Sequence, residues 1–128
     1  MPERLLLDTN IIIHYLQGEK IFVEFLDKKI KAYAHIFVST ISVTELYSKP
    51  GIKKSEVELI EDFLLAVNIA QNDYMISKTA GFIRQNIKIK TPDAIIAATA
   101  ICINAKLVTE NKKDFKNIPD LDLEVVML

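Results

Sequence analysis

The sequence has little of the residues that build several common kinds of site. Its single cysteine, Cys102, excludes an internal disulfide and a cage of thiolate metal ligands. Its three glycines, Gly18, Gly51 and Gly81, are isolated from one another, so the chain has no glycine-rich phosphate-binding loop. Nucleotide-driven chemistry is therefore not expected. Cys102 lies in the apolar stretch 100–103, which predicts a small buried side chain, with a reactive thiol as the alternative.

Long apolar runs and a charge excess are also missing. No run reaches the length of a membrane-spanning helix, and the apolar segment 5–7 is too short for a signal peptide. We therefore expect a cytoplasmic protein without membrane contact. The formal net charge is −1, whereas proteins that bind nucleic acids usually carry a basic excess. Lysines are nevertheless grouped, and the groups in 49–54 and 112–116 are those expected to meet a polyanion, if they are not simply solvated.

The pattern that is present predicts an α/β fold. Half of the 128 residues are hydrophobic and none of the sequence is of low complexity, which favours one globular domain spanning residues 1–128. Short apolar segments typical of strands alternate with segments of helical spacing. The strands are expected at 4–8, 36–38, 67–69, 106–109 and 124–127, and the helices at 9–17, 21–30, 41–47, 55–67, 73–86 and 91–105. This order predicts a three-layer α/β/α sandwich with a mostly parallel central sheet of about five strands.

Two helix starts have recognisable local signals. Ser55, with Glu58 three residues later, has the spacing of a capping box. Thr91 followed by Pro92 is typical of a hydroxyl cap with proline in the first turn. The helix that follows is apolar nearly all round, so we expect it to be buried.

Four acidic residues far apart in the sequence are predicted to meet at one edge of the sheet: Asp8, Glu45, Asp93 and Asp114. Ligands of parallel sheets bind at the carboxyl ends of the strands, and Asp8 directly follows the first strand. Glu45 and Asp114 come just after the second and fourth strands, and Asp93 begins the helix that leads into the fourth. Each also has an ordinary explanation: a helix cap for Asp8, the helix dipole for Asp93, and solvated surface positions for Glu45 and Asp114.

A cluster of carboxylates raises the pKa of its members because like charges repel, and a hard divalent cation with oxygen ligands relieves that repulsion. The sequence therefore predicts a divalent-metal site at this edge. It offers no other convincing general base. His14 falls within the first helix and His35 at the amino end of the second strand, and both are interpreted as structural or surface residues.

Several segments together resemble the PIN domain, and most nearly its VapC-type toxins. The resemblance covers about residues 5–126 and rests on four motifs: 7–12 (LDTNII), 42–46 (SVTEL), 91–100 (TPDAIIAATA) and 107–115 (LVTENKKDF). It implies a metal-dependent endoribonuclease of a type II toxin–antitoxin system that uses Mg²⁺ or Mn²⁺ and leaves a 5′-phosphate and a 3′-hydroxyl. It also implies an RNA substrate, a cognate antitoxin and a homodimer.

The resemblance also assigns roles to residues. It places Asp8, Asp93 and Asp114 on the metal, with Glu45 completing the shell or orienting the attacking water, while Thr9, Thr109 and Asn111 support them. Glu110 departs from the family pattern, which often has a basic residue there, and is left out of the site.

Two other functions remain open at this level. A PIN-like fold could bind RNA or a protein without cutting. A receiver-like phosphoacceptor also gathers acids at strand ends, but usually needs two adjacent acids early in the chain, and here only Asp8 follows the first strand.

Overall fold

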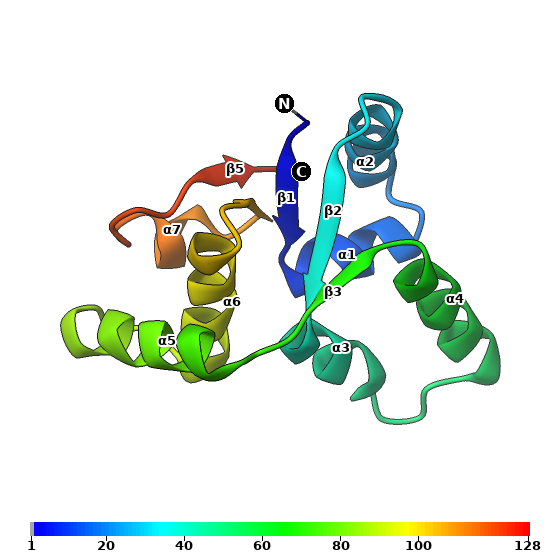
Figure 1. The fold of residues 1–128 in the computed structure, drawn as a ribbon. Coiled ribbons are helices and arrows are strands. Elements are labelled where there is room, and N and C mark those ends of the chain that lie inside the picture. The colour runs from blue at the N-terminus through cyan, green and yellow to red at the C-terminus, as the bar shows by residue number, and fades with distance from the viewer. Residues whose placement is uncertain (1) are drawn as a thin grey trace.

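The computed structural model describes residues 2–128, and its centre is a parallel sheet (Figure 1). Its strands are β1 (Arg4–Leu7), β2 (His35–Ser39), β3 (Asn68–Ala70), β4 (Lys106–Thr109) and β5 (Leu123–Val125). They are arranged in the order β3-β2-β1-β4-β5, and every neighbouring pair is parallel. The predicted five strands and their orientation are confirmed, with β3 at an edge.

The strand order reverses between β1 and β4. The chain builds outwards from β1 to β3 and then crosses back to place β4 on the other side of β1. Leu7 pairs with Val108 at this junction, so the residues that follow the two strands emerge side by side. In a sheet of this kind, such a point forms a crevice at the carboxyl ends of the strands.

Helices cover both faces of the sheet (Figure 1). They are α1 (Thr9–Leu16), α2 (Lys20–Lys31), α3 (Thr40–Tyr47), α4 (Lys54–Leu65), α5 (Tyr74–Asn86), α6 (Thr91–Cys102) and α7 (Lys112–Phe115). Helices α5, α6 and α7 pack on one face, and α1, α2 and α4 on the other. The predicted three-layer sandwich is therefore confirmed.

Alternate residues of the central strands fill the two cores. Leu6 and Leu107 pack towards α5 and α6, while Leu5, Leu7 and Val108 pack towards α1, α2 and α4. All five side chains are fully buried. Because the side chains of a strand alternate between faces, a strand segment buried on both faces must be apolar throughout, as residues 5–7 of β1 are.

Both predicted helix caps are wrong by one or two residues. Ser55 lies inside the first turn of α4, and the capping contact is made by Glu56, whose Oε1 accepts from the Lys53 N–H at 3.2 Å. Thr91 is the first residue of α6 rather than its cap, because Lys90 takes the extended cap conformation. Pro92 still lies in the first turn, where its missing N–H is not needed.

The prediction of a buried Cys102 is also wrong. Most of α6 is buried as expected, but Cys102 lies in its last turn and is exposed, with its Sγ 3.6 Å from Thr79 Oγ1 of α5. An all-apolar helix has no polar stripe to reveal which side faces solvent. Within residues 2–128, none of the helices combines the length and apolar character needed to cross a lipid bilayer.

Candidate functional site

Asp8 lies in the crevice where the strand order reverses. It follows β1, is only 9% exposed, and begins α1 by accepting the Thr9 N–H on Oδ1 at 2.9 Å. Its other oxygen, Oδ2, accepts from Thr109 Oγ1 at the end of β4, at 2.8 Å. The start of α1 and the end of β4 thus fix the two carboxylate oxygens of Asp8, and the second contact spans 101 residues of sequence.

A chain of hydrogen bonds continues from Thr109 to Asp114. The Asn111 N–H donates to Thr109 Oγ1 at 3.0 Å, and Asn111 Nδ2 donates to Asp114 Oδ2 at 2.6 Å. The Asp114 N–H in turn donates to Asn111 Oδ1 at 3.3 Å, which caps the short helix α7. Asn111 therefore orients the Asp114 carboxylate, which is itself exposed.

Glu45 is joined to the same site through the hydroxyl of Thr9. Thr9 Oγ1 donates to Glu45 Oε1 at 2.6 Å and lies 2.8 Å from Ser42 Oγ. Since the single hydroxyl proton of Thr9 goes to Glu45, Ser42 must be the donor in the second contact. Ser42 lies in the motif 42–46, but the sequence analysis gave it no role. Its position three residues before Glu45 could have indicated one, because residues three apart share one face of a helix.

The pKa of Asp93 is affected by the charges of the other three acids. It lies in the first turn of α6 and is partly buried. Burial raises the pKa of its carboxyl group, and repulsion from Asp8, Asp114 and Glu45 raises it further, while Lys90 acts in the opposite direction. The fold thus brings Asp8, Glu45 and Asp114 within electrostatic reach of Asp93.

The pKa of Asp8 is raised as well. Burial is the largest cause, opposed by the hydrogen bonds from Thr109 and Thr9 and reinforced by the charges of Glu45 and Glu110. None of the four acids forms an ion pair with any residue in 2–128. Lys90 offsets part of the repulsion at Asp93, but no cation of the described residues is paired with any of the four carboxylates.

The donor set has the chemistry of a hard-cation site. Carboxylate, hydroxyl and amide oxygens are the ligands that Mg²⁺ and Mn²⁺ prefer. In the part of the chain that the structure describes, no three His, Cys, Asp or Glu side chains lie close enough to form a ready-made metal cage. The acids are thus assembled and oriented without being drawn into a closed shell.

Glu110, which sequence reasoning left out, has a partner of its own. Both of its carboxylate oxygens lie 3.1 Å from His14 Nε2. His14 also contacts Glu19 through Nδ1 and stacks on Phe22 at 4.4 Å between ring centroids. His14 therefore links α1, α2 and the end of β4. His35, at the amino end of β2, lies away from the acids, as expected.

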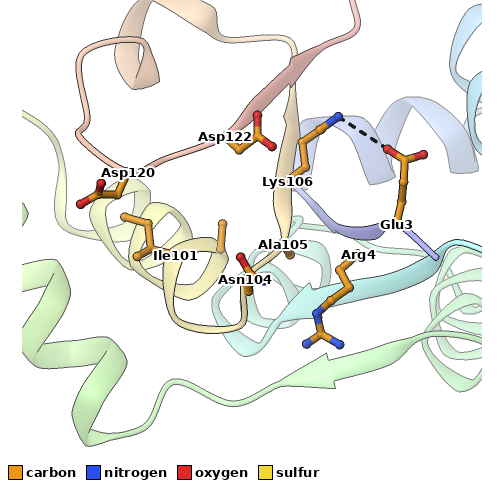
Figure 2. A pocket seen from close by; sticks show the side chains of 9 residues that line it. Glu3, Arg4, Ile101, Asn104, Ala105, Lys106, Asp120 and Asp122 are labelled. Carbon is orange, nitrogen blue, oxygen red and sulfur yellow. Dashed lines mark ion pairs between the residues drawn. The ribbon is translucent and has the colours of Figure 1, made fainter. Parts of the chain in front are cut away.

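Two surface concavities lie at opposite ends of the sheet. One, of about 390 Å³, runs beside the acids and is lined by Arg84, Lys88, Ile89, Lys90, Asp93 and Asp114. The other, of about 240 Å³, lies at the amino ends of β1 and β4 (Figure 2). Its charged residues include Glu3, Arg4, Lys106, Asp120 and Asp122, and none of the four site acids reaches it.

Known proteins resemble this chain over nearly its whole length. The family model of the PIN domain matches residues 5–121. "Ribonuclease VapC19" of Mycobacterium tuberculosis is 31% identical, over 91% of this chain and 95% of that protein. "Ribonuclease VapC" of Rickettsia bellii is 30% identical, over 97% of each. Among solved structures, VapBC2 of Rickettsia felis bound to a fragment of its promoter DNA superposes with a TM-score of 0.86 at 29% identity, covering 97% of this chain and 99% of that one. The chain belongs to the PIN domain family.

Proposed function

We propose that this chain is an endoribonuclease, the toxin of a type II toxin–antitoxin system, that uses Mg²⁺ or Mn²⁺ to hydrolyse RNA phosphodiester bonds. One observation carries the proposal: Asp8, Glu45, Asp93 and Asp114 converge at the carboxyl ends of the strands with no cation of residues 2–128 paired to them. Perturbed carboxyl groups gathered in a crevice are typical of functional sites. The relatives named ribonuclease VapC support the choice of RNA as substrate.

In this proposal Asp8, Asp93 and Asp114 hold the metal ion, and Glu45 completes its ligands or orients the attacking water. A divalent ion lowers the pKa of bound water and polarises a phosphoryl oxygen. The chain's own part is to hold the carboxylates in place. Thr109 and the Thr9 N–H hold the two oxygens of Asp8, Thr9 Oγ1 positions Glu45, and Asn111 orients Asp114.

The proposal also covers binding partners, oligomeric state and cellular location. Similar solved structures include the "Toxin-antitoxin complex from Klebsiella pneumoniae", which is 30% identical to this chain with a TM-score of 0.73. We infer that this chain also pairs with a cognate antitoxin, forms a homodimer, acts in the cytoplasm and folds as one domain over residues 1–128.

Cleavage of a labelled RNA, with and without metal, tests the function. The purified protein should cut in Mg²⁺ or Mn²⁺, stop in EDTA, and leave a 5′-phosphate and a 3′-hydroxyl at each new end. Asp93→Asn should abolish cleavage and keep the fold, because Asp93 makes no side-chain hydrogen bond that the fold of residues 2–128 needs. Cleavage by folded Asp93→Asn at the normal rate would refute the assignment.

A non-catalytic PIN-like module that binds RNA or a protein is the second candidate. The observation in its favour is that the acids of residues 2–128 form no ready-made metal cage. Such a module would bind the labelled RNA but leave it intact at every metal concentration. Membership in the PIN family leaves the phosphoacceptor hypothesis without support.

A further inference from the structure

The groove beside the acids is built by the connection between α5 and α6. Ile89 is buried and anchors this connection to the core, and Arg84 Nε donates to the Ile89 carbonyl at 2.9 Å. The segment that carries Lys88 and Lys90 is therefore attached both to the core and to the last turn of α5. Its cations and the acids Asp93 and Asp114 line one concavity.

The cations of this groove are available for an external anion. Arg84, Lys88 and Lys90 are exposed, and none of them forms an ion pair within residues 2–128. By contrast, Lys29 and Lys106 at the other end of the sheet each pair with two carboxylates. The chain is almost neutral overall, so its positive potential is local and is concentrated where cations remain unpaired.

The lining of the groove combines charges of both signs. Arg84, Lys88 and Lys90 are cationic, and Asp93 and Asp114 are two of the four site acids. Its volume, about 390 Å³, is within the range of pockets that hold one small molecule, so the groove has room for part of one strand. Phosphates on either side of a bond held at the acids would therefore lie near these cations.

We propose that this groove is the path along which a single RNA strand reaches the four acids, with Arg84, Lys88 and Lys90 binding the phosphates that flank the scissile one. The assignment rests on the proposed function for the identity of the strand. The cations supply sequence-independent affinity, because each phosphate contact releases a condensed counterion. The groove therefore positions the strand without reading its sequence.

Binding of fluorescein-labelled polyuridylate in EDTA tests the groove without requiring cleavage. The variant is Lys88→Gln/Lys90→Gln. The matched control is Lys28→Gln/Lys31→Gln in the last turn of α2, where both lysines are exposed and unpaired within residues 2–128. For single strands each contact contributes about 0.7 to the slope of log K against log[salt]. Loss of two contacts should lower the slope by about 1.4 and, in about 0.1 M salt, weaken binding up to about 25-fold.

Each outcome separates the groove from the nuclease assignment. In the cleavage assay, Lys88→Gln/Lys90→Gln should raise KM more than it lowers kcat, because the four acids are untouched. If the variant had the same affinity and salt slope as the control pair, the groove would not be the path of the RNA strand, even if the wild type cuts RNA. Equal losses for single-stranded and duplex RNA would overturn the single-strand path. If the wild type binds polyuridylate through these lysines but never cuts it, the proposed nuclease activity would be refuted, and the groove would stand.

Discussion

The two ends of the sheet differ in whether their charged side chains form ion pairs. At the amino end, Glu3 and Glu124 each lie within 3.8 Å of both Lys29 and Lys106, and the closest contact, Lys29 to Glu3, is 2.7 Å. Figure 2 shows the pair of Glu3 and Lys106 at that end. At the carboxyl end, Asp93 is repelled by the other three site carboxylates, and none of the four pairs with a cation among residues 2–128.

The pKa directions express the same difference. Lys29 holds the pKa of Glu3 below its usual value, whereas burial and repulsion raise the pKa of Asp8 and Asp93. Charges at the amino end stabilise the fold modestly, as exposed ion pairs do. Charges at the carboxyl end oppose folding and are tolerated, which points to a function that requires them. The contrast teaches that a charge cluster is informative when its charges are unpaired.

The largest expected effect separates the two ends by activity. Asp8→Asn should lower RNA cleavage by more than about 100-fold, because loss of even an outer partner of a metal ligand costs about 10- to 100-fold. Glu3→Gln should leave cleavage unchanged. Initial rates on a labelled RNA, with circular dichroism to verify folding, measure both. Equal rates for the two variants would abolish the functional distinction between the ends.

A smaller effect is expected from the residue that joins β4 to Asp8. Thr109→Val removes the donor to Asp8 Oδ2 and the acceptor of the Asn111 N–H, both buried or partly buried. It should cost about 1–3 kcal/mol of unfolding free energy, and activity should fall about 10- to 100-fold. Thr109→Ser keeps the hydroxyl and should recover most of the activity, measured by urea unfolding and by cleavage. Failure of serine to restore cleavage would show that the hydroxyl does not position Asp8.

The smallest expected effect is on the pH dependence of the unfolding free energy, where variants at the two ends should shift stability in opposite directions. A raised carboxyl pKa binds the proton more tightly in the folded state, so metal-free protein loses stability as the pH rises through that pKa. Neutral Asp93→Asn escapes this loss and should become the more stable protein towards pH 7, by no more than about 1 kcal/mol.

The matched variant at the amino end should behave in the opposite way. The lowered pKa of Glu3 means that its contribution is present above the unfolded pKa and lost as the pH falls through the folded one. Glu3→Gln should therefore be the less stable protein near pH 7, and its difference from wild type should vanish in acid. Thermal unfolding in EDTA from about pH 2 to about pH 7, which extends below the usual range of carboxyl titration, measures both. Shifts of the same sign at pH 7 would contradict the comparison.

The approach of the four acids to one edge of the sheet could be predicted from sequence because parallel topology constrains it. Apolar segments such as 5–7 and 106–109, alternating with helical spacing, lead to a parallel sheet, and Asp8 at a strand end must then face the crevice. Local signals were less reliable. The caps were expected at Ser55 and Thr91 but lie at Lys53 and Lys90. Backbone conformation decides where a helix begins, and sequence motifs only bias it.

The sequence by itself determined the layered α/β architecture and the residues available to gather at its edge, because side-chain periodicity and strand order follow from local chemistry. Only the tertiary structure decided the exposure of Cys102, the link from Ser42 through Thr9 to Glu45, and the contact of His14 with Glu110. These depend on how helices rotate and pack across long stretches of chain. Neighbouring residues contain no record of that geometry.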